Sequence, residues 1–296
     1  MSLNILQNVN LAPYTSWQIG GPADFFCLPT GLDELREALK TARERNWAVT
    51  ILGGGSNVLV SDQGISGLTV CLRRFSAVQT DVREGRFYVD CLSGTTKSEL
   101  LKIFLKHQLA PALFLAGLPG DVGGGVVMNA GVAEAFEPRE FMELVDHIEV
   151  MTAAGELLCL QKSDLTVSYR HTDGWQPHIV VSARLSWPYV QKPEILSQVR
   201  EANKVRLSKQ PLDMPSCGSV FKNPEGHKVA QLIDHCGLKG LTIGDAQVSL
   251  KHANFIVNTG QASAADTWAL IEKVRAVVLE KTGLQISTEV VRLGRW

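Results

Sequence analysis

Apolar residues along this chain follow two spacings, and each spacing predicts a different element. Between positions 32 and 46, leucine and alanine side chains recur every three or four residues with charged residues between them, which predicts an amphipathic helix. The apolar run at 48–52 is short and continuous, which is typical of a buried strand. It leads directly into Gly53-Gly54-Gly55-Ser56-Asn57, so a glycine-rich turn is expected where that strand ends.

The same patterns predict the other elements and the fold class. Residues 116–131 contain so many glycines that we expect neither a good free helix nor a good strand there. Strands and helices fall in separate stretches, which favours an α+β fold over a doubly wound sheet. We predict strands at 58–60, 67–72, 86–92, 179–187, 254–257 and 285–293, a hairpin of 147–152 with 156–160, and helices at 97–107, 194–207, 229–236 and 264–281.

Length and composition restrict the class of protein. A chain of 296 residues, 45% hydrophobic and 20% charged, favours two globular domains and allows three small ones. The net charge of −1 gives no electrostatic case for binding nucleic acid or an anionic membrane. The six cysteines form no C-x-x-C pair and none lies at zinc-ligand spacing with a histidine, so we predict reduced thiols and no metal site. The N-terminus has no signal-peptide pattern and no apolar run approaches the ~20 residues of a membrane helix, which predicts a cytoplasmic location.

The glycine-rich turn at Gly53 matches neither common phosphate-binding motif. A P-loop needs Lys followed by Ser or Thr after its second glycine, and a dinucleotide fingerprint needs a glycine at position 58, where this chain has Val58. Taken alone, the triple glycine is compatible with a tight turn or with backbone N–H groups that bind phosphate. The second glycine-rich stretch, at 116–131, favours a large phosphate-bearing ligand.

Seven short motifs follow one another along nearly the whole chain. They are residues 15–21 (TSWQIGG), 52–60 (LGGGSNVLV), 117–124 (GLPGDVGG) with 129–131 (NAG), 168–170 (SYR), 215–224 (PSCGSVFKNP), 243–248 (IGDAQV) with 254–258 (NFIVN), and 288–294 (TEVVRLG). In this order they resemble the motifs of the UDP-N-acetylenolpyruvoylglucosamine reductases (UDP-N-acetylmuramate dehydrogenases) of peptidoglycan precursor synthesis. The chain is similar to the shorter subtype, which lacks an extra substrate-covering loop. It departs from the family at Val132-Ala133-Glu134, where the usual residues are Ala-Tyr-Gly.

The resemblance implies an α+β enzyme in three parts. Two lobes, at 1–70 and 71–188, would form a vanillyl-alcohol-oxidase (PCMH-type) FAD-binding fold, and a C-terminal α/β domain at 189–296 would bind the substrate. NADPH would reduce FAD, and the flavin would pass hydride to the enolpyruvyl double bond of UDP-N-acetylglucosamine enolpyruvate, giving UDP-N-acetylmuramate. The expected protein is a monomer with a ping-pong cycle. No Rossmann fingerprint marks an NADPH site, so that cofactor rests on the resemblance.

Three residues match the catalytic positions of the family. Ser219 matches the proton donor, because hydride delivery leaves enolate character on the carbon beside the carboxylate and a hydroxyl held there can protonate it. Arg170 would pair with the developing enolate-carboxylate, and Glu289 would orient donors or assist proton delivery. Without the resemblance, these residues are also compatible with a loop serine, a surface ion pair and an edge-strand charge. Cys217 is a stronger acid than Ser219 by reference pKa, but it lies off the motif position and is expected to be structural.

Two further groups of residues match ligand positions in the family. Backbone N–H groups of the first group would donate to the FAD pyrophosphate, with side-chain donors added by Ser56 and Asn57. His252, in the second group, is compatible with a substrate contact or a bystander. The cofactor-binding positions are Gly53, Gly54, Gly55, Ser56, Asn57, Gly117, Pro119, Gly120, Gly123, Gly124 and Gly131, and the substrate-binding positions are Arg206, Lys209, Asn223, Lys251 and His252.

Two other classes of protein share part of this pattern. A related flavin oxidase would use oxygen as its acceptor, but Ser219, Arg206 and Lys209 would have no purpose in it. A non-catalytic flavin- or nucleotide-binding module would hold FAD without turning over NADPH. Oxygen uptake without a UDP-sugar would indicate the first class, and bound FAD without NADPH turnover would indicate the second.

Overall fold

The computed structural model describes residues 3–132 and 137–296, and the chain divides into two units. Each unit combines segments that are far apart in the sequence. Unit 1 contains the described residues up to Leu6 together with Phe26–Gly54 and Leu68–Val205. Unit 2 contains Gln7–Phe25, Gly55–Gly67 and Arg206–Trp296. Of the Val132-Ala133-Glu134 departure, Ala133 and Glu134 lie outside the described residues.

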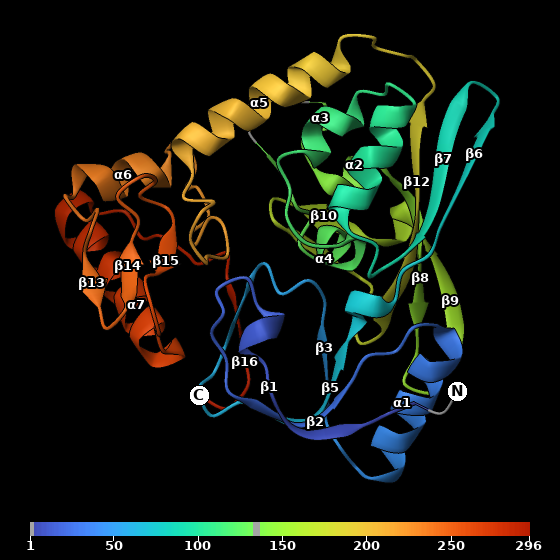
Figure 1. Cartoon of the computed structure of the whole chain (residues 1–296), viewed down its shortest axis with the longest axis horizontal. Helices are drawn as coiled ribbons and strands as arrows, with labels where there is room; N and C mark the ends of the chain where they lie inside the picture. The colour runs from blue at the N-terminus through green and yellow to red at the C-terminus, as the bar shows by residue number, and fades with distance from the viewer. Residues whose placement is uncertain (1–2, 133–136) are drawn as a thin grey trace. The chain divides into compact units, whose positions relative to one another are not determined.

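An antiparallel five-stranded sheet lies at the centre of unit 1 (Figure 1). The strands follow the order β6-β7-β12-β8-β9, so β12 pairs with β7 on one side and with β8 on the other. Phe87, Val89 and Cys91 of β7 alternate as buried residues, as the two-residue period of a strand requires. The predicted hairpin is confirmed as β8 and β9. The strands are β6 (Val78–Arg83), β7 (Arg86–Leu92), β8 (Val145–Met151), β9 (Leu157–Gln161) and β12 (Ile179–Pro188).

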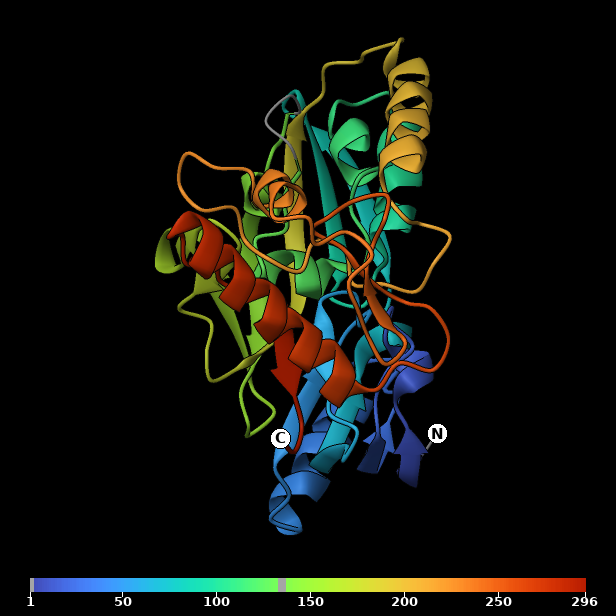
Figure 2. The same cartoon turned by 90° about the vertical axis from the view of Figure 1, so that its left-hand side faces the viewer.

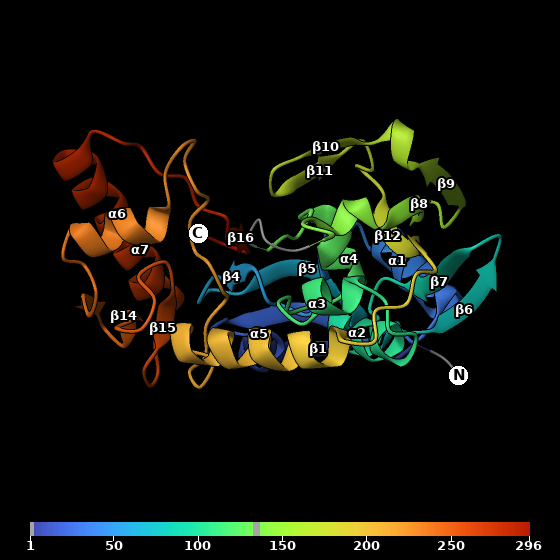
Figure 3. The same cartoon turned by 90° about the horizontal axis from the view of Figure 1, so that it is seen from above.

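Three helices pack against this sheet and complete the core of unit 1 (Figures 1 and 3). Leu100 and Phe104 of α2, Phe114 of α3 and Val126 of α4 are fully buried in one hydrophobic cluster with the sheet residues. Burying each such side chain contributes about 1.5–3 kcal/mol, so this cluster stabilises the packing of the helices on the sheet. The helices are α2 (Lys97–Lys106), α3 (Pro111–Leu115) and α4 (Val122–Val127).

Helix α4 forms inside the glycine-rich stretch for which we expected no good free helix. Two features of its surroundings explain the difference. Asp121 caps the helix, because its side chain accepts the Gly124 N–H at 2.8 Å. Val122 and Val126 are fully buried in the core of unit 1. Tertiary packing therefore offsets the poor helix propensity of three consecutive glycines.

Helix α1 and strands β3 and β5 follow the predicted pattern, whereas the sequence predicts no strand at β10 or β11. The predicted helix at 32–46 is α1 (Leu32–Glu44), which contacts the β8–β9 turn through hydrogen bonds from Arg36 and Arg43 to backbone carbonyls. The strand that precedes the first glycine-rich turn is β3, which pairs in parallel with β5. The strands are β3 (Val49–Leu52), β5 (Ile65–Cys71), β10 (Thr166–Ser168) and β11 (His171–Asp173), the last two forming an antiparallel pair.

Unit 2 has a small antiparallel sheet covered by two helices. The strands follow the order β13-β14-β15, and the long helix α7, coloured red in Figure 2, buries Leu270, Ile271 and Val274 in the core of this unit. The N-terminus of α7 is capped by the Ser263 hydroxyl and by the Asp62 carboxylate. The elements are β13 (Thr242–Ile243), β14 (Ala246–Val248), β15 (Ile256–Asn258), α6 (Val229–His235) and α7 (Ala264–Thr282).

A separate parallel pair in unit 2 joins β4 (Val58–Val60) to β16 (Val291–Leu293). The predicted strand at 285–293 is therefore confirmed only at its end. The residues before it pair instead with the 215–224 motif, as the isolated bridge between Phe221 and Thr288 shows. Four elements contain residues of both units: β5, β1 (Leu6–Asn10), β2 (Pro22–Cys27) and α5 (Ile195–Lys209). Within residues 3–132 and 137–296, no helix combines the length and the apolar character needed to cross a membrane.

Candidate active site and cofactor loops

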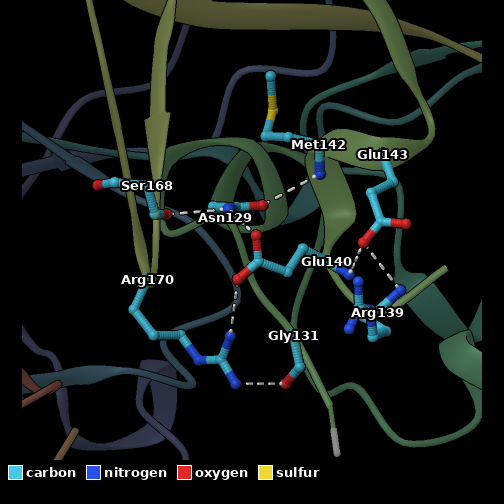
Figure 4. A network of polar contacts seen from close by, with 8 residues as sticks. All are labelled: Asn129, Gly131, Arg139, Glu140, Met142, Glu143, Ser168 and Arg170. Atoms are coloured by element: carbon cyan, nitrogen blue, oxygen red, sulfur yellow. Dashed lines mark hydrogen bonds and ion pairs between the residues drawn. The ribbon is translucent and has the colours of Figure 1, made fainter. Parts of the chain in front are cut away.

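Arg170 lies in a cage of unit 1 residues (Figure 4). Its Nη2 donates to the Gly131 carbonyl at 3.0 Å, and its Nη1 lies 3.7 Å from Oε1 of Glu140. Only 12% of the Arg170 side chain is exposed, which distinguishes this contact from a solvated surface ion pair. A Cβ on Gly131 would overlap the guanidinium, so glycine is required at that position. Arg170 also has a φ of 56°, a conformation that a non-glycine residue keeps only where its surroundings fix it.

Asn129 and Glu140 form the far side of this cage. Asn129 is fully buried, and its Nδ2 donates to Oε2 of Glu140 at 2.7 Å and to the Ser168 carbonyl at 2.9 Å. Its Oδ1 accepts the Met142 N–H at 3.2 Å. Glu140 thus turns one carboxylate oxygen to Asn129 and the other to Arg170. We had assigned no role to either residue; the NAG motif at 129–131 marked Asn129, but nothing in the sequence marked Glu140.

Ser219 lies on a loop of unit 2 that main-chain hydrogen bonds hold from two sides. The Val220 N–H donates to the Asn254 carbonyl at 2.9 Å, and the Val220 carbonyl accepts the Glu289 N–H at 2.8 Å. Gly218 has a φ of 81°, which glycine adopts without strain. Ser219 is half-buried, and nothing in the part of the chain that the structure describes hydrogen-bonds its hydroxyl. The loop therefore holds the Ser219 hydroxyl in a fixed place, and the hydroxyl takes no part in the bonds that fix the loop.

Glu289 and Cys217 lie beside the same loop. The Glu289 backbone is fixed by the bond to Val220 and by a second bond, in which Nδ2 of Asn57 donates to the Glu289 carbonyl at 3.0 Å. Cys217 is only 4% exposed. Burial, with a smaller contribution from the Glu289 carboxylate, raises the pKa of the Cys217 thiol well above its ordinary value. Cys217 is therefore a protonated, structural thiol at neutral pH.

The first glycine-rich turn has backbone donors that fit an anionic ligand. Gly55 has a φ of 69°, and a Cβ there would overlap the Tyr14 carbonyl, so the chain can pass this point only with glycine. The N–H groups of Gly55, Ser56 and Asn57 donate to no acceptor in the described residues. Three successive unpaired N–H groups are suited to bind phosphate oxygens. These residues fit the pyrophosphate of FAD.

The Asn57 side chain has a protein partner of its own. One N–H of its side-chain amide donates to the Glu289 main-chain carbonyl. The main-chain carbonyl of Asn57 accepts the Val291 N–H at 3.1 Å. The two bonds lie on either side of Val290 and extend the pairing of β4 with β16. The end of the first glycine-rich turn is therefore bonded directly to the backbone that carries Glu289.

The second glycine-rich stretch contacts the first within unit 1. Asp121 is 3% exposed, and its carboxylate accepts the Gly124 N–H at 2.8 Å and also the Gly54 N–H. A Cβ on Gly54 would lie 3.1 Å from Cα of Gly120, and a Cβ on Gly53 would lie 2.5 Å from Oδ2 of Asp121. The glycines at 53 and 54 thus let the two stretches approach each other. The Gly54 N–H differs from the N–H groups of Gly55, Ser56 and Asn57, because it already donates to the Asp121 carboxylate.

Other predicted cofactor positions in this stretch are close to buried groups. The Pro119 carbonyl accepts a hydrogen bond from Nζ of Lys97 at 2.9 Å. A Cβ added at Gly123 would lie 3.0 Å from Cβ of Ser93. A Cβ added at Gly117 would lie 2.9 Å from Cγ1 of Val132. The Ser93 hydroxyl is buried and has no hydrogen-bond partner in the described residues. Glycine at 117 and 123 thus permits close packing that a larger side chain would disturb.

The predicted substrate residues on and after α5 differ in their surroundings. Nε of Arg206 donates to Oε1 of Gln210 at 2.8 Å, and burial lowers the pKa of the Arg206 guanidinium. Lys209, the last residue of α5, is exposed. Asn223 is exposed too, but its Oδ1 accepts the Val229 N–H at 3.0 Å at the start of α6. Its amide nitrogen is the part of Asn223 suited to a ligand acceptor.

Lys251 and His252 lie on a tight turn of unit 2. The Ser249 hydroxyl accepts both of their N–H groups, at 3.1 Å and 3.3 Å. Lys251 is exposed, whereas His252 is half-buried and packs edge-on against Phe255. Burial, and next the charge of Lys239, lower the pKa of His252, so its ring is neutral at neutral pH. A neutral imidazole can bind a ligand only as an ordinary hydrogen-bonding group.

Two family models match separate parts of the chain. An FAD binding domain matches residues 23–161, and the C-terminal domain of UDP-N-acetylenolpyruvoylglucosamine reductase matches residues 210–293. The first match contains both glycine-rich stretches, and the second contains Ser219 and Glu289. The expected flavin-binding fold with a distinct C-terminal substrate domain is thereby confirmed at the level of fold.

Relatives of full length give the same picture. The chain is 42% identical to UDP-N-acetylenolpyruvoylglucosamine reductase of Synechococcus sp. (strain WH7803), over 97% of this chain and 93% of that protein. It is 39% identical to the reductase of that name from Levilactobacillus brevis, over 99% of this chain and 94% of that protein. The crystal structure of UDP-N-acetylenolpyruvylglucosamine reductase from Thermus caldophilus superposes with a TM-score of 0.77 at 30% identity, covering 99% of each chain.

Proposed function

Because this chain belongs to the UDP-N-acetylenolpyruvoylglucosamine reductase family, we propose that it reduces UDP-N-acetylglucosamine enolpyruvate to UDP-N-acetylmuramate with NADPH as hydride donor. Its FAD-binding domain makes it an FAD-containing oxidoreductase. The observation that carries the proposal is the similarity to named reductases along almost the entire chain, including the segment around Ser219.

The two glycine-rich stretches would hold FAD. When bound, FAD would supply the hydride-transfer chemistry that links NADPH to the enolpyruvyl double bond. The contribution of the chain is to fix the pyrophosphate, for which the N–H groups of Gly55, Ser56 and Asn57 are the best-placed donors. Gly53 and Gly54 keep the first turn against the second stretch.

Ser219 would complete the reduction by supplying the proton. Addition of hydride to one carbon of the double bond moves an electron pair toward the neighbouring carboxyl-bearing carbon, and one proton must be added there. The Ser219 hydroxyl is half-buried and uncommitted to other residues in the described chain, and its loop is fixed by the bonds at Val220. A group in this state can deliver a proton without first breaking a hydrogen bond.

Arg170 and Glu289 would provide the charges that this step requires. The guanidinium of Arg170 is shielded from water, so its attraction for the developing enolate-carboxylate is less screened than that of a surface arginine. Glu289 lies on the backbone next to the Ser219 loop, where its carboxyl group would orient the serine donor or assist proton delivery to it. Arg206 and Lys209 carry positive charge suited to a diphosphate and a carboxylate.

The cellular setting follows from the proposed substrate. UDP-sugar precursors of peptidoglycan are made in the cytoplasm, and we place the protein there as a monomer. The cysteines agree with a reducing compartment, because the structure records all six as free thiols.

An anaerobic absorbance titration of the purified protein tests the proposal. We expect flavin bands, bleaching of these bands by NADPH, and their recovery when UDP-N-acetylglucosamine enolpyruvate is added. Bleaching without recovery would keep the flavoprotein and exclude this substrate. Recovery by oxygen alone, with no response to the enolpyruvyl sugar, would indicate an oxidase. Absence of flavin even after FAD is added back would mean that the glycine-rich stretches bind another ligand.

A further inference from the structure

A buried carboxylate and a buried amine lie under the second glycine-rich stretch, and the proposed reaction uses neither. Asp121 is 3% exposed and Lys97 is also 3% exposed. Ionised side chains are almost never buried to this degree unless they are paired, because desolvation costs several kcal/mol for each charge. Some contribution to binding or folding must therefore offset the cost of these two charges.

Asp121 connects two parts of unit 1 that are 67 residues apart in the sequence. Oδ1 accepts the Gly124 N–H at 2.8 Å, which is an ordinary helix cap for α4. Oδ2 accepts the Gly54 N–H of the first glycine-rich turn. The cap alone would need only one oxygen, and a serine or threonine would supply it. The second bond reaches the other cofactor stretch and needs a carboxylate of this length.

The bond at Gly54 resembles the contact expected from a ligand. The next three N–H groups of the same turn have no acceptor in the described residues and are free for phosphate oxygens. The Asp121 carboxylate thus provides, at Gly54, the anionic acceptor that pyrophosphate would provide at its neighbours. The Asp121 carboxylate thus fixes the first residues of the turn, while the N–H groups of Gly55, Ser56 and Asn57 stay available to a ligand.

Lys97 supports this arrangement from beneath. Its Nζ donates to the Pro119 carbonyl at 2.9 Å, and its backbone N–H donates to the Gly120 carbonyl at 3.0 Å. Both bonds hold the residues immediately before Asp121. Burial lowers the pKa of Lys97 to about 8, and the Asp121 charge acts in the opposite direction. Lys97 is thus mostly cationic at neutral pH and compensates part of the Asp121 charge.

We propose that Asp121, supported by Lys97, is a positioning residue that locks the first glycine-rich turn onto the second stretch before FAD arrives. The lock fixes the turn in its binding conformation, so FAD binding costs less conformational entropy. It also fits the glycines at 53 and 54, since a Cβ at Gly53 would lie 2.5 Å from the Asp121 carboxylate and a Cβ at Gly54 would lie 3.1 Å from Cα of Gly120. The inference concerns cofactor binding and is independent of the substrate assigned above.

Substitution of Asp121 separates the lock from the helix cap. Asp121→Ser keeps a capping oxygen for Gly124 but is too short to reach Gly54. We expect this variant to fold and to release FAD from the holoenzyme about tenfold faster, since a hydrogen bond to a charged group has been lost. ADP, which carries the pyrophosphate without the flavin ring, should lose affinity for the apoprotein by a similar factor. Flavin fluorescence measures the first quantity and calorimetry the second.

The direction of the change in FAD and ADP affinity shows whether the Asp121 carboxylate helps the turn to bind pyrophosphate or repels the pyrophosphate. Unchanged FAD release together with unchanged ADP affinity in the Asp121→Ser variant would overturn the proposal, as would tighter binding, which would mean that the carboxylate repels the pyrophosphate. Loss of FAD affinity with ADP affinity unchanged would also contradict it, because the lock acts on the pyrophosphate turn.

Amide hydrogen exchange of the wild-type apoprotein keeps the proposal testable if the variant does not fold. The Gly54 N–H should be protected, whereas those of Gly55, Ser56 and Asn57 should exchange rapidly. Equally rapid exchange at all four positions would contradict the lock.

Discussion

Arg170 and Ser219, to which we assign parts of the same reaction, are held in opposite ways. Arg170 is fixed through its side chain, by the Gly131 carbonyl and by Glu140, in surroundings that leave it 12% exposed. Ser219 is fixed through its backbone, and its own hydroxyl is unpaired in the described residues. A charge needs neighbours that orient it and limit its hydration, whereas a proton donor needs a hydroxyl free to form a new bond. The two regions should therefore respond differently to substitution.

The largest effect on reoxidation of the reduced enzyme is expected at Ser219, whose side chain makes no bond to the described residues that supports the structure. Ser219→Ala removes only the hydroxyl, since the bonds that hold the loop, at Val220 and Phe221, do not involve the Ser219 side chain. We expect reoxidation of the reduced enzyme by the enolpyruvyl sugar to slow by at least ~100-fold, the usual contribution of a general acid. Flavin reduction by NADPH and the melting temperature should stay near the wild-type values. Stopped-flow absorbance separates the two half-reactions, and equal slowing of both would contradict the proton-donor role.

An intermediate effect is expected in the side-chain cage. Glu140→Gln can still accept the Asn129 bond but loses the charge that faces Arg170. Arg170 would then be less firmly oriented, and we expect reoxidation to slow about tenfold, equivalent to about 1.4 kcal/mol. Unlike Ser219→Ala, this variant should also lose thermal stability, because the negative charge of Glu140 no longer offsets the positive charge of the mostly buried Arg170 guanidinium.

A matched control for the cage is Asp90→Asn, which breaks the Arg184–Asp90 ion pair elsewhere in unit 1. That pair has side chains 33% and 43% exposed, so its loss should leave both half-reactions unchanged. If Glu140→Gln behaves like this control, Glu140 does not orient Arg170.

The same contrast explains what the sequence could and could not predict. The α7 helix was predicted at 264–281 and lies at Ala264–Thr282, because its apolar period and its Ser263 cap are local signals. Helix α4 escaped prediction because its stability comes from distant core residues. Ser219 could be singled out through its motif. Glu140 could not, because its partners Asn129 and Arg170 lie 11 and 30 residues away and no spacing rule connects them.

A smaller effect on reoxidation is expected at Asn57, which bonds the Glu289 segment through both its side chain and its main chain. Asn57→Ala removes the bond to the Glu289 carbonyl but keeps the main-chain bond from Val291. A single hydrogen bond of this kind contributes about 1 kcal/mol, so we expect reoxidation to slow about fivefold through misplacement of Glu289. FAD should stay bound, because the N–H donors of the turn remain.

The control for Asn57 is Gln247→Ala, which removes an exposed side-chain bond to Thr242 in the same unit. It should leave both half-reactions unchanged. Weaker FAD binding by Asn57→Ala, with normal reoxidation, would assign the amide to the cofactor instead of to Glu289.

The smallest effect is expected at Cys217, which is near Ser219 but has the opposite properties. Its thiol is buried, and burial together with the Glu289 charge raises its pKa well above its ordinary value, so it stays protonated through neutral and mildly alkaline pH. A thiol in that state gives up a proton less readily than an ordinary one and should resist alkylation by iodoacetamide at pH 8. Cys217→Ala leaves the loop bonds at Val220 in place, so both half-reactions should stay within about twofold of wild type, with a stability loss of about 1 kcal/mol for the small cavity. A collapse of reoxidation equal to that of Ser219→Ala would transfer the proton-donor role to the thiol.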